Sequence, residues 1–109
     1  RKRLDKKISK FKNHYIVCGY GRIGKIFCQM IKEEKDEIVV IEKDENLITT
    51  LQKDKMYYVY GDASDEDILT KAGIAKASFL IAALATDSIN VFLVFNISTT
   101  GARHNINIR

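Results

Sequence analysis

The sequence has few of the residues that build metal sites, and it has no long hydrophobic run. It contains two cysteines, Cys18 and Cys28, and two histidines, His14 and His104, at spacings that match no metal-binding pattern. The cysteines lie in apolar surroundings, so we expect small core side chains in a reducing compartment. We expect both histidines to be solvated. No apolar run approaches the ~18 residues that a membrane-spanning helix needs, and no signal peptide is visible.

Basic side chains are concentrated at the start of the chain. Residues 1–12 carry seven basic side chains and one acid, Asp5, whereas the rest of the chain carries eleven basic and thirteen acidic side chains. The formal net charge of +4 therefore comes from this first segment, and the remainder is slightly acidic. This distribution disfavours nucleic-acid binding by the domain as a whole.

What the sequence does contain is a glycine-rich motif made of Gly19, Tyr20, Gly21, Arg22, Ile23 and Gly24. It follows an apolar run at 15–18, opens a helical pattern, and precedes an acid, Glu42, by about twenty residues. The first glycine allows a tight turn, the second lets backbone approach a pyrophosphate, and the third lets the helix pack on the strand. Unpaired N–H groups at the helix start favour phosphate. The motif predicts a site for an adenine dinucleotide or a close relative.

Strand and helix patterns alternate along the chain. We expect strands at 15–18, 38–41, 57–60, 79–83 and 106–108. We expect helices at 22–35, after the capping Asp44, from the Ser64/Asp67 capping box to Gly73, and from Asp87 or Ser88 to about Gly101. This pattern predicts an α/β fold, a Rossmann-like doubly wound parallel sheet in the order 3-2-1-4-5. Because the chain starts at Arg1 and stops at about the fifth strand, we expect a fragment of a larger protein.

Several polar residues follow the predicted strands and should meet the glycine motif at one sheet edge. Glu42 is placed to accept hydrogen bonds from ribose hydroxyls and to repel a 2′-phosphate, which favours NAD over NADP. Lys43 weakens that preference. The Gly61-Asp62-Ala63 turn faces the same crevice, although an aspartate after glycine is also a common turn residue. Arg22 could bind phosphate through two hydrogen bonds or point outward to a partner subunit.

Four segments resemble one known family. The run from Asn13 to Gly24 is similar to the start of an RCK (regulator of potassium conductance) domain, also called a TrkA-N or KTN domain. The turn at 61–65, the segment 69–74 and the helix start with Asp87 and Asn90 are also similar to that family. The resemblance covers 13–109, which is nearly the whole chain.

The resemblance implies a cytoplasmic regulatory domain that binds NAD(H) or an adenine nucleotide (AMP, ADP or ATP) and changes the conductance of a potassium pore. By position, phosphates would be held by Gly19, Gly21, Arg22, Ile23 and Gly24, the ribose by Glu42, and the adenosine would be flanked by Asp62 and Ala63. Such domains form homodimers through their nucleotide-binding lobes and often an octameric ring. We expect the lobe contact on the fourth helix, with Phe92 and Phe95. Calcium-binding members have acidic clusters that this chain lacks, so we expect no metal site.

The basic start favours a channel over a separate transporter subunit. Leu4, Ile8 and Phe11 are spaced as on one helix face, so residues 1–13 are interpreted as a basic linker or helix that follows a pore helix. In that interpretation residues 14–109 are the nucleotide-binding lobe. The linker would lie at the cytoplasmic membrane surface, where basic residues also meet anionic lipid. A solvated tail is the alternative.

Three other functions stay open at this point. The chain could be the soluble regulatory subunit of a Trk/Ktr-type potassium uptake system, or the NAD-binding half of a dehydrogenase. It could also bind nucleic acid through residues 1–12. A dehydrogenase needs a substrate domain and a positioned acid or base, and the sequence offers neither. We therefore expect a binding domain with no catalytic residues.

Overall fold

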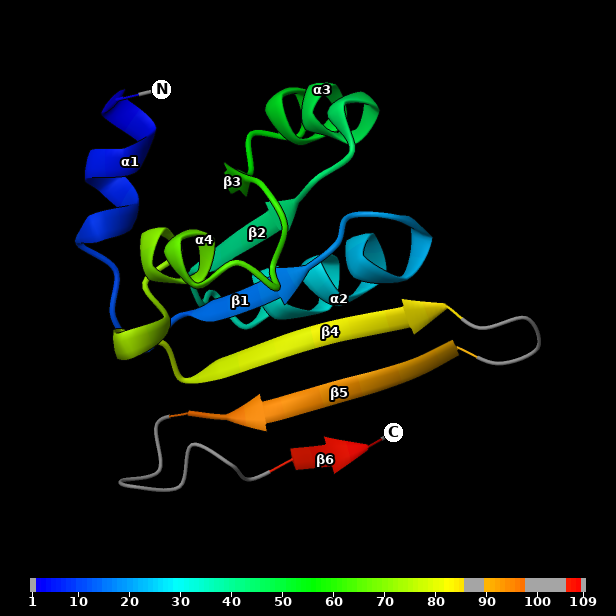
Figure 1. The fold of residues 1–109 in the computed structure, drawn as a ribbon. Coiled ribbons are helices and arrows are strands. Elements are labelled where there is room, and N and C mark those ends of the chain that lie inside the picture. Colours follow the sequence, from blue (N-terminus) through cyan, green and yellow to red (C-terminus); the bar gives the residue numbers. More distant parts are fainter. Residues whose placement is uncertain (1, 86–89, 98–105, 109) are drawn as a thin grey trace.

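In the computed structural model, which describes residues 2–85, 90–97 and 106–108, strands and helices alternate up to residue 85 (Figure 1). The elements are α1 (Lys2–Ser9), β1 (Tyr15–Cys18), α2 (Arg22–Glu33), β2 (Ile38–Glu42), α3 (Glu45–Lys53), β3 (Tyr57–Tyr60), α4 (Glu66–Lys71), the short turn of 3₁₀-helix η1 (Ile74–Lys76), β4 (Phe79–Ala85), β5 (Asn90–Asn96) and β6 (Ile106–Ile108). No helix within these ranges is long and apolar enough to cross a membrane.

All six strands form one sheet in the order β3-β2-β1-β4-β5-β6. β1 to β4 are parallel, with β1 between β2 and β4, as in one half of a doubly wound fold. The predicted order 3-2-1-4 and the α/β class are therefore confirmed. The strand bounds agree with the predicted ranges to within two residues.

The predicted fourth helix is wrong. Its middle part is β5, which runs antiparallel to β4 over seven residue pairs from Phe79↔Asn96 to Ala85↔Asn90. The segment 91–95 consists of five consecutive apolar residues, β-branched or aromatic except Leu93, which fit a strand better than a one-sided helix. The predicted fifth strand is β6, which pairs with β5 and not with β4. The predicted helix ends, Asp87, Ser88 and Gly101, lie outside the described residues.

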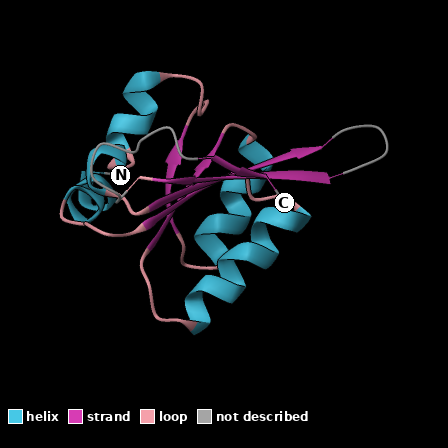
Figure 2. Cartoon of the chain, turned by 90° about the horizontal axis from the view of Figure 1, so that it is seen from below, coloured by secondary structure: helices cyan, strands magenta, loops and turns pink. Residues whose placement is uncertain are grey.

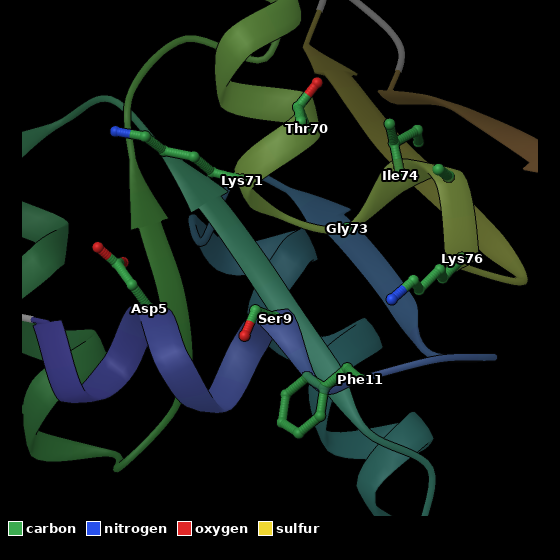
Figure 3. A pocket seen from close by; sticks show the side chains of 9 residues that line it. Asp5, Ser9, Phe11, Thr70, Lys71, Gly73, Ile74 and Lys76 are labelled. Carbon is green, nitrogen blue, oxygen red and sulfur yellow. The ribbon is translucent and has the colours of Figure 1, made fainter.

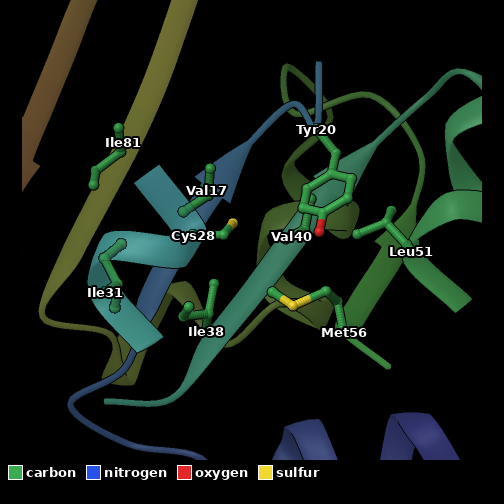
Figure 4. Packing of buried hydrophobic residues seen from close by; sticks show 9 residues of the cluster. All are labelled: Val17, Tyr20, Cys28, Ile31, Ile38, Val40, Leu51, Met56 and Ile81. Atoms are coloured by element: carbon green, nitrogen blue, oxygen red, sulfur yellow. The ribbon is translucent and has the colours of Figure 1, made fainter. Parts of the chain in front are cut away.

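Helices cover the two faces of the sheet unequally (Figure 2). α2 and α3 lie on one face, over a core of Val17, Tyr20, Cys28, Ile31, Ile38, Val40, Leu51, Met56 and Ile81 (Figure 4). α1 and α4 lie on the other face, over a core that contains Ile8, Ile16, Val39, Ile41, Val59, Ala72 and Ala77. On this second face, β4 and β5 extend beyond the two helices (Figure 2).

The N-caps of α3 and α4 can be compared with the caps predicted from the sequence. Asp44 caps α3 as predicted, because its side chain accepts a hydrogen bond of 2.9 Å from the backbone N–H of Asn46. α4 is capped by Asp65 and not by the predicted Ser64, since Asp65 accepts the N–H of Asp67 at 2.9 Å. Gly73, with φ of 81°, follows the helix in the left-handed conformation expected after a C-cap.

His14 is buried, contrary to the sequence prediction. Its side chain is fully inaccessible, and its Nε2 lies 2.8 Å from the carbonyl oxygen of Ala72. Because a carbonyl can only accept, Nε2 carries the proton, and Nδ1 has no hydrogen-bond partner among the described residues. Burial lowers the pKa of His14. The ring thus joins the start of β1 to the end of α4, while His104 lies outside the described residues.

The two cysteines are free, as predicted. Cys28 is buried and Cys18 is partly buried. Burial raises the pKa of each thiol to about 12, so both remain protonated at neutral pH and act as small apolar side chains.

Candidate functional site

The carboxyl ends of β1, β2 and β3 lie beside an open crevice of about 640 Å³. This volume is in the range of small-molecule sites. The crevice is lined by Cys18, Gly19, Ile41, Glu42, Lys43, Gly61, Asp62, Ala63, Ser64, Leu80, Ala82, Leu93 and Phe95. Six of the eleven residues predicted from the sequence therefore meet here: Gly19, Glu42, Lys43, Gly61, Asp62 and Ala63.

The other five predicted residues belong to the glycine motif and do not line this crevice. They are Tyr20, Gly21, Arg22, Ile23 and Gly24. Tyr20 and Gly21 form the turn from β1 into α2, and Arg22, Ile23 and Gly24 are the first residues of α2. The motif residue that lines the crevice is thus its first glycine, and the others lie toward and within the start of α2.

The third glycine of the motif permits the close approach that the sequence predicted. A Cβ on Gly24 would collide with the carbonyl oxygen of Gly19, so only glycine lets α2 begin this close to the loop. Gly19 itself has φ of 104°, in the region that favours glycine. A Cβ on Gly21 would meet nothing within 4 Å, which leaves open space beside the N-cap of α2.

Glu42 is the central polar group of the site. It is buried, with 7% of its surface exposed. Its Oε1 accepts a hydrogen bond of 2.7 Å from the N–H of Tyr20, and its Oε2 accepts bonds of 2.9 Å from the N–H groups of Lys43 and Asp44. A carboxylate accepts roughly four hydrogen bonds. Glu42 therefore holds the glycine loop to the β2–α3 turn, and the described residues leave one of its acceptor positions unused.

Tyr20 fixes the same loop from the opposite side of the sheet. Its ring is buried in the core between the sheet and helices α2 and α3 (Figure 4). Its hydroxyl donates a hydrogen bond of 2.7 Å to Oδ2 of Asp54. Lys25 lies 3.8 Å from the same carboxylate. Burial, together with the bond to Asp54, raises the pKa of Tyr20. The backbone and the side chain of this one residue thus anchor the loop at two places.

Asp62 lies at the mouth of the crevice and is exposed. Its Oδ1 accepts hydrogen bonds of 2.9 Å from both the N–H and the hydroxyl of Ser64, and its Oδ2 lies 4.0 Å from Nζ of Lys43. The hydrogen bonds from Ser64 hold the pKa of Asp62 below its ordinary value. Asp62 is thus charged at neutral pH and has an oxygen directed toward Lys43 across the mouth.

The far wall of the crevice is apolar and comes from β4 and β5. Leu80 and Ala82 of β4 pair in register with Phe95 and Leu93 of β5, and all four line the crevice. Sequence reasoning missed this wall because it assigned Leu93 and Phe95 to a helix. The available signal was the β-branched and aromatic content of the segment 91–95. A polar edge opposite an apolar wall suits a ligand with hydroxyl groups on one side and a flat ring on the other.

Comparison with known proteins agrees with this fold. Residues 15–109 match the TrkA-N domain family. The chain is 43% identical over 98 residues to potassium channel protein 1 and 42% identical over 95 residues to the probable potassium channel protein 2 of Methanocaldococcus jannaschii. These matches cover 88% and 84% of this chain and only 29% and 28% of the two relatives.

Two further similarities extend this set. The glutathione-regulated potassium-efflux system protein KefC of Cronobacter sakazakii is 37% identical over 84 residues, which are 77% of this chain and 14% of that protein. The crystal structure of the TrkA-N domain of the inner membrane protein ybaL from Escherichia coli superposes with a TM-score of 0.63 at 29% identity, covering 67% of this chain and 54% of that one. The chain belongs to the TrkA-N domain family.

Proposed function

We propose that this chain is a ligand-sensing regulatory domain of a potassium channel, and that it binds NAD(H) or an adenine nucleotide in the crevice. The observation that carries the proposal is the meeting of the glycine loop, Glu42 and Asp62 at the carboxyl ends of three parallel strands. Ligands of open α/β sheets bind at such edges. The names of the channel relatives support the choice of potassium channel.

The crevice suggests a role for each part of the ligand. The free acceptor position on Oε1 of Glu42 would take one ribose hydroxyl, because the other positions are used by backbone N–H groups. The adenine would lie against the wall that includes Leu80 and Phe95. Phosphates would lie toward the start of α2, whose N-cap Gly21 has no side-chain cap. The exposed Arg22, which forms no ion pair among the described residues, would approach them from solvent.

The proposed activity is sensing and not catalysis. The thiol that lines the crevice, Cys18, has its pKa raised to about 12 by burial, so it stays protonated at neutral pH and is a poor nucleophile. The two carboxylates, Glu42 and Asp62, are held by hydrogen bonds from backbone and serine groups. These carboxylates suit recognition of hydroxyl groups better than proton transfer.

The mechanism would be a ligand-linked shift between conducting and closed states. A nucleotide changes the balance only if it binds the two states with unequal affinity. A coupling free energy of ~1–3 kcal/mol per site is typical of allostery. Several such sites acting on one pore would suffice to open or close it.

The partners and the location belong to the same proposal. We expect homodimers through the nucleotide-binding lobes, an octameric ring in the full assembly, and a pore domain at the cytoplasmic face of the membrane. The contact surface expected on the fourth helix needs revision, because that segment is β5 and Phe95 lines the crevice. Sedimentation of the chain with and without nucleotide would measure the association.

Calorimetric titration tests the binding step. The chain is titrated in turn with NAD, NADH, AMP, ADP and ATP, and the titration is repeated on Asp62→Asn and on the control Asp36→Asn, an exposed residue outside the crevice. We expect saturable binding of at least one nucleotide that weakens in Asp62→Asn and not in the control. Absence of binding by all five nucleotides would contradict the proposal.

A regulatory domain of a potassium-efflux system is a second candidate, because the chain also matches the KefC protein. The two candidates share the proposed nucleotide site and differ in how potassium crosses the membrane. Potassium flux measured in vesicles that contain the full-length protein separates them. A passive conductance that responds to nucleotide supports the channel, whereas potassium movement coupled to a counter-ion supports the efflux system.

A further inference from the structure

The first helix presents a fixed basic surface. Its apolar side packs on the sheet through Ile8, which is 1% exposed, and the segment that follows it is held by the Phe11 ring, which lies edge-on to Tyr57 with ring centroids 4.9 Å apart. The helix cannot roll without losing these contacts. The exposed basic side chains of this region are Arg3, Lys6 and Lys7 on α1 and Lys10 and Lys12 directly after it.

None of these basic side chains forms an ion pair within the described part of the chain. The two ion pairs found in the described part of the chain are Lys25–Asp54 and Lys43–Asp62, on other elements. Lys71 and Lys76, on α4 and η1 beside α1, are also exposed and outside those pairs. Asp5 is the one acid in residues 1–12. The surface is therefore strongly positive, although the rest of the chain is slightly acidic.

Three of these lysines converge on a hollow. Lys10, Lys12 and Lys76 line a space of about 390 Å³ together with Asn13, and no acidic residue is among its lining residues. The backbone holds this arrangement, because the N–H of Asn13 donates a hydrogen bond of 2.7 Å to the carbonyl oxygen of Lys76. Lysine ammonium groups form charge-assisted hydrogen bonds to phosphate oxygens, so three lysines around one hollow suit a phosphate group.

A second, more apolar hollow adjoins the first. It has a volume of about 410 Å³ and lies between α1 and the α4–η1 turn, with Phe11 and Ile74 on its walls and Ser9 and Asp5 along α1 (Figure 3). Lys76 and Ala75 line both hollows. A cationic site for an anion is thus continuous with a space that suits a hydrocarbon group.

We propose that this pair of hollows binds an anionic phospholipid of the bilayer surface. The phosphate would lie among Lys10, Lys12 and Lys76, and the glycerol and upper acyl chain would enter the space beside Phe11 and Ile74. A free phosphate would use the lysine hollow alone. A nucleic-acid backbone would also leave the apolar hollow unused, so the combination favours a lipid.

The lipid site is separate from the nucleotide crevice. It lies at the start of β1, next to Asn13, whereas the crevice lies where β1 ends, at Cys18 and Gly19. The inference therefore holds whether or not a nucleotide binds. Lipid binding would hold α1 against a membrane surface, because polybasic segments are attracted to anionic lipid.

Co-sedimentation with vesicles tests the charge requirement. The chain is mixed with vesicles of phosphatidylcholine alone, or of phosphatidylcholine with phosphatidylglycerol. We expect binding to the second kind only, weakened about tenfold or more in Lys10→Gln/Lys76→Gln. The control Lys32→Gln/Lys53→Gln removes the same charge from exposed positions on the opposite face and should bind like the parent chain. Equal loss in both double variants would overturn the proposal.

Short-chain lipids test the apolar hollow. Monomeric short-chain phosphatidylglycerol should bind more tightly than glycerol phosphate. Ser9→Phe, an exposed position that lines only the apolar hollow, should weaken the binding of the lipid and leave that of glycerol phosphate unchanged. Equal affinity for the two ligands, or duplex DNA bound more tightly than anionic vesicles, would overturn the proposal. Thermal unfolding of each variant confirms that its fold is retained.

Discussion

The carboxylate of Glu42 accepts a hydrogen bond of 2.7 Å from the backbone N–H of Tyr20, which lies inside the glycine loop 22 residues earlier in the chain. The acidic residue that sequence reasoning assigned to the ribose is therefore part of the structure that holds the glycine loop. If Glu42 binds the ligand as proposed, ligand contact and loop geometry are linked through one side chain, and several predictions depend on that link.

Glu42→Gln should destabilise the fold as well as weaken nucleotide binding. The amide would place an NH₂ group against backbone N–H donors, which removes charge-assisted hydrogen bonds in a buried place. We expect a loss of ~2–3 kcal/mol in the free energy of unfolding, measured by urea denaturation. Glu45→Gln, at an exposed position of α3, is the control. A change in Glu42→Gln no larger than that of the control would contradict a structural role.

Tyr20→Phe should loosen the loop without emptying the core. The phenyl ring still fills the space, but the bond from the hydroxyl to Asp54 is lost. We expect a loss of ~1 kcal/mol in stability, together with weaker nucleotide binding. Tyr60→Phe, at a residue 45% exposed, should change neither quantity. Unchanged nucleotide affinity in Tyr20→Phe would show that this anchor does not position the loop.

The second and third glycines of the motif should respond differently to substitution by alanine. Gly24→Ala places a methyl group against the carbonyl oxygen of Gly19, so the start of α2 must shift. We expect a loss of ~1–3 kcal/mol in the free energy of unfolding. Gly21→Ala meets open space and should fold normally while weakening nucleotide binding. Similar stability losses in the two variants would contradict the structure of the loop.

Protonation of His14 should make the fold less stable in mild acid. Its pKa in the folded chain is lowered from the ordinary value of 6.5 by burial, whereas the unfolded chain keeps that value. The unfolded state then binds the proton more readily, so stability falls as the pH drops below about 6.5. His14→Gln can keep a donor toward Ala72 without titrating in this range. Thermal unfolding as a function of pH should show a smaller decrease for this variant than for the parent chain.

The parallel strands β1 to β4 and the polar side of the crevice could be predicted from local sequence patterns. The glycine motif, the buried run at 38–41 and Glu42 each combine a residue type with a spacing that only one geometry satisfies. β5 was missed because five consecutive apolar residues fit either a helix or a strand, and pairing with β4 decides between them. His14 was misjudged because its burial depends on tertiary contacts, with the Phe11 ring and with the carbonyl of Ala72, which lies 58 residues away in the sequence.

The position of the bound nucleotide tests the central claim most directly. Amide spectra recorded by NMR during a titration with the tightest-binding nucleotide report which residues it contacts. We predict the largest shifts at Gly19, Tyr20, Lys43, and the segment 61–64, with little change at residues 10–12 and 74–76. Shifts confined to the lysine hollow beside α1, or saturation without change at the glycine loop, would contradict the account.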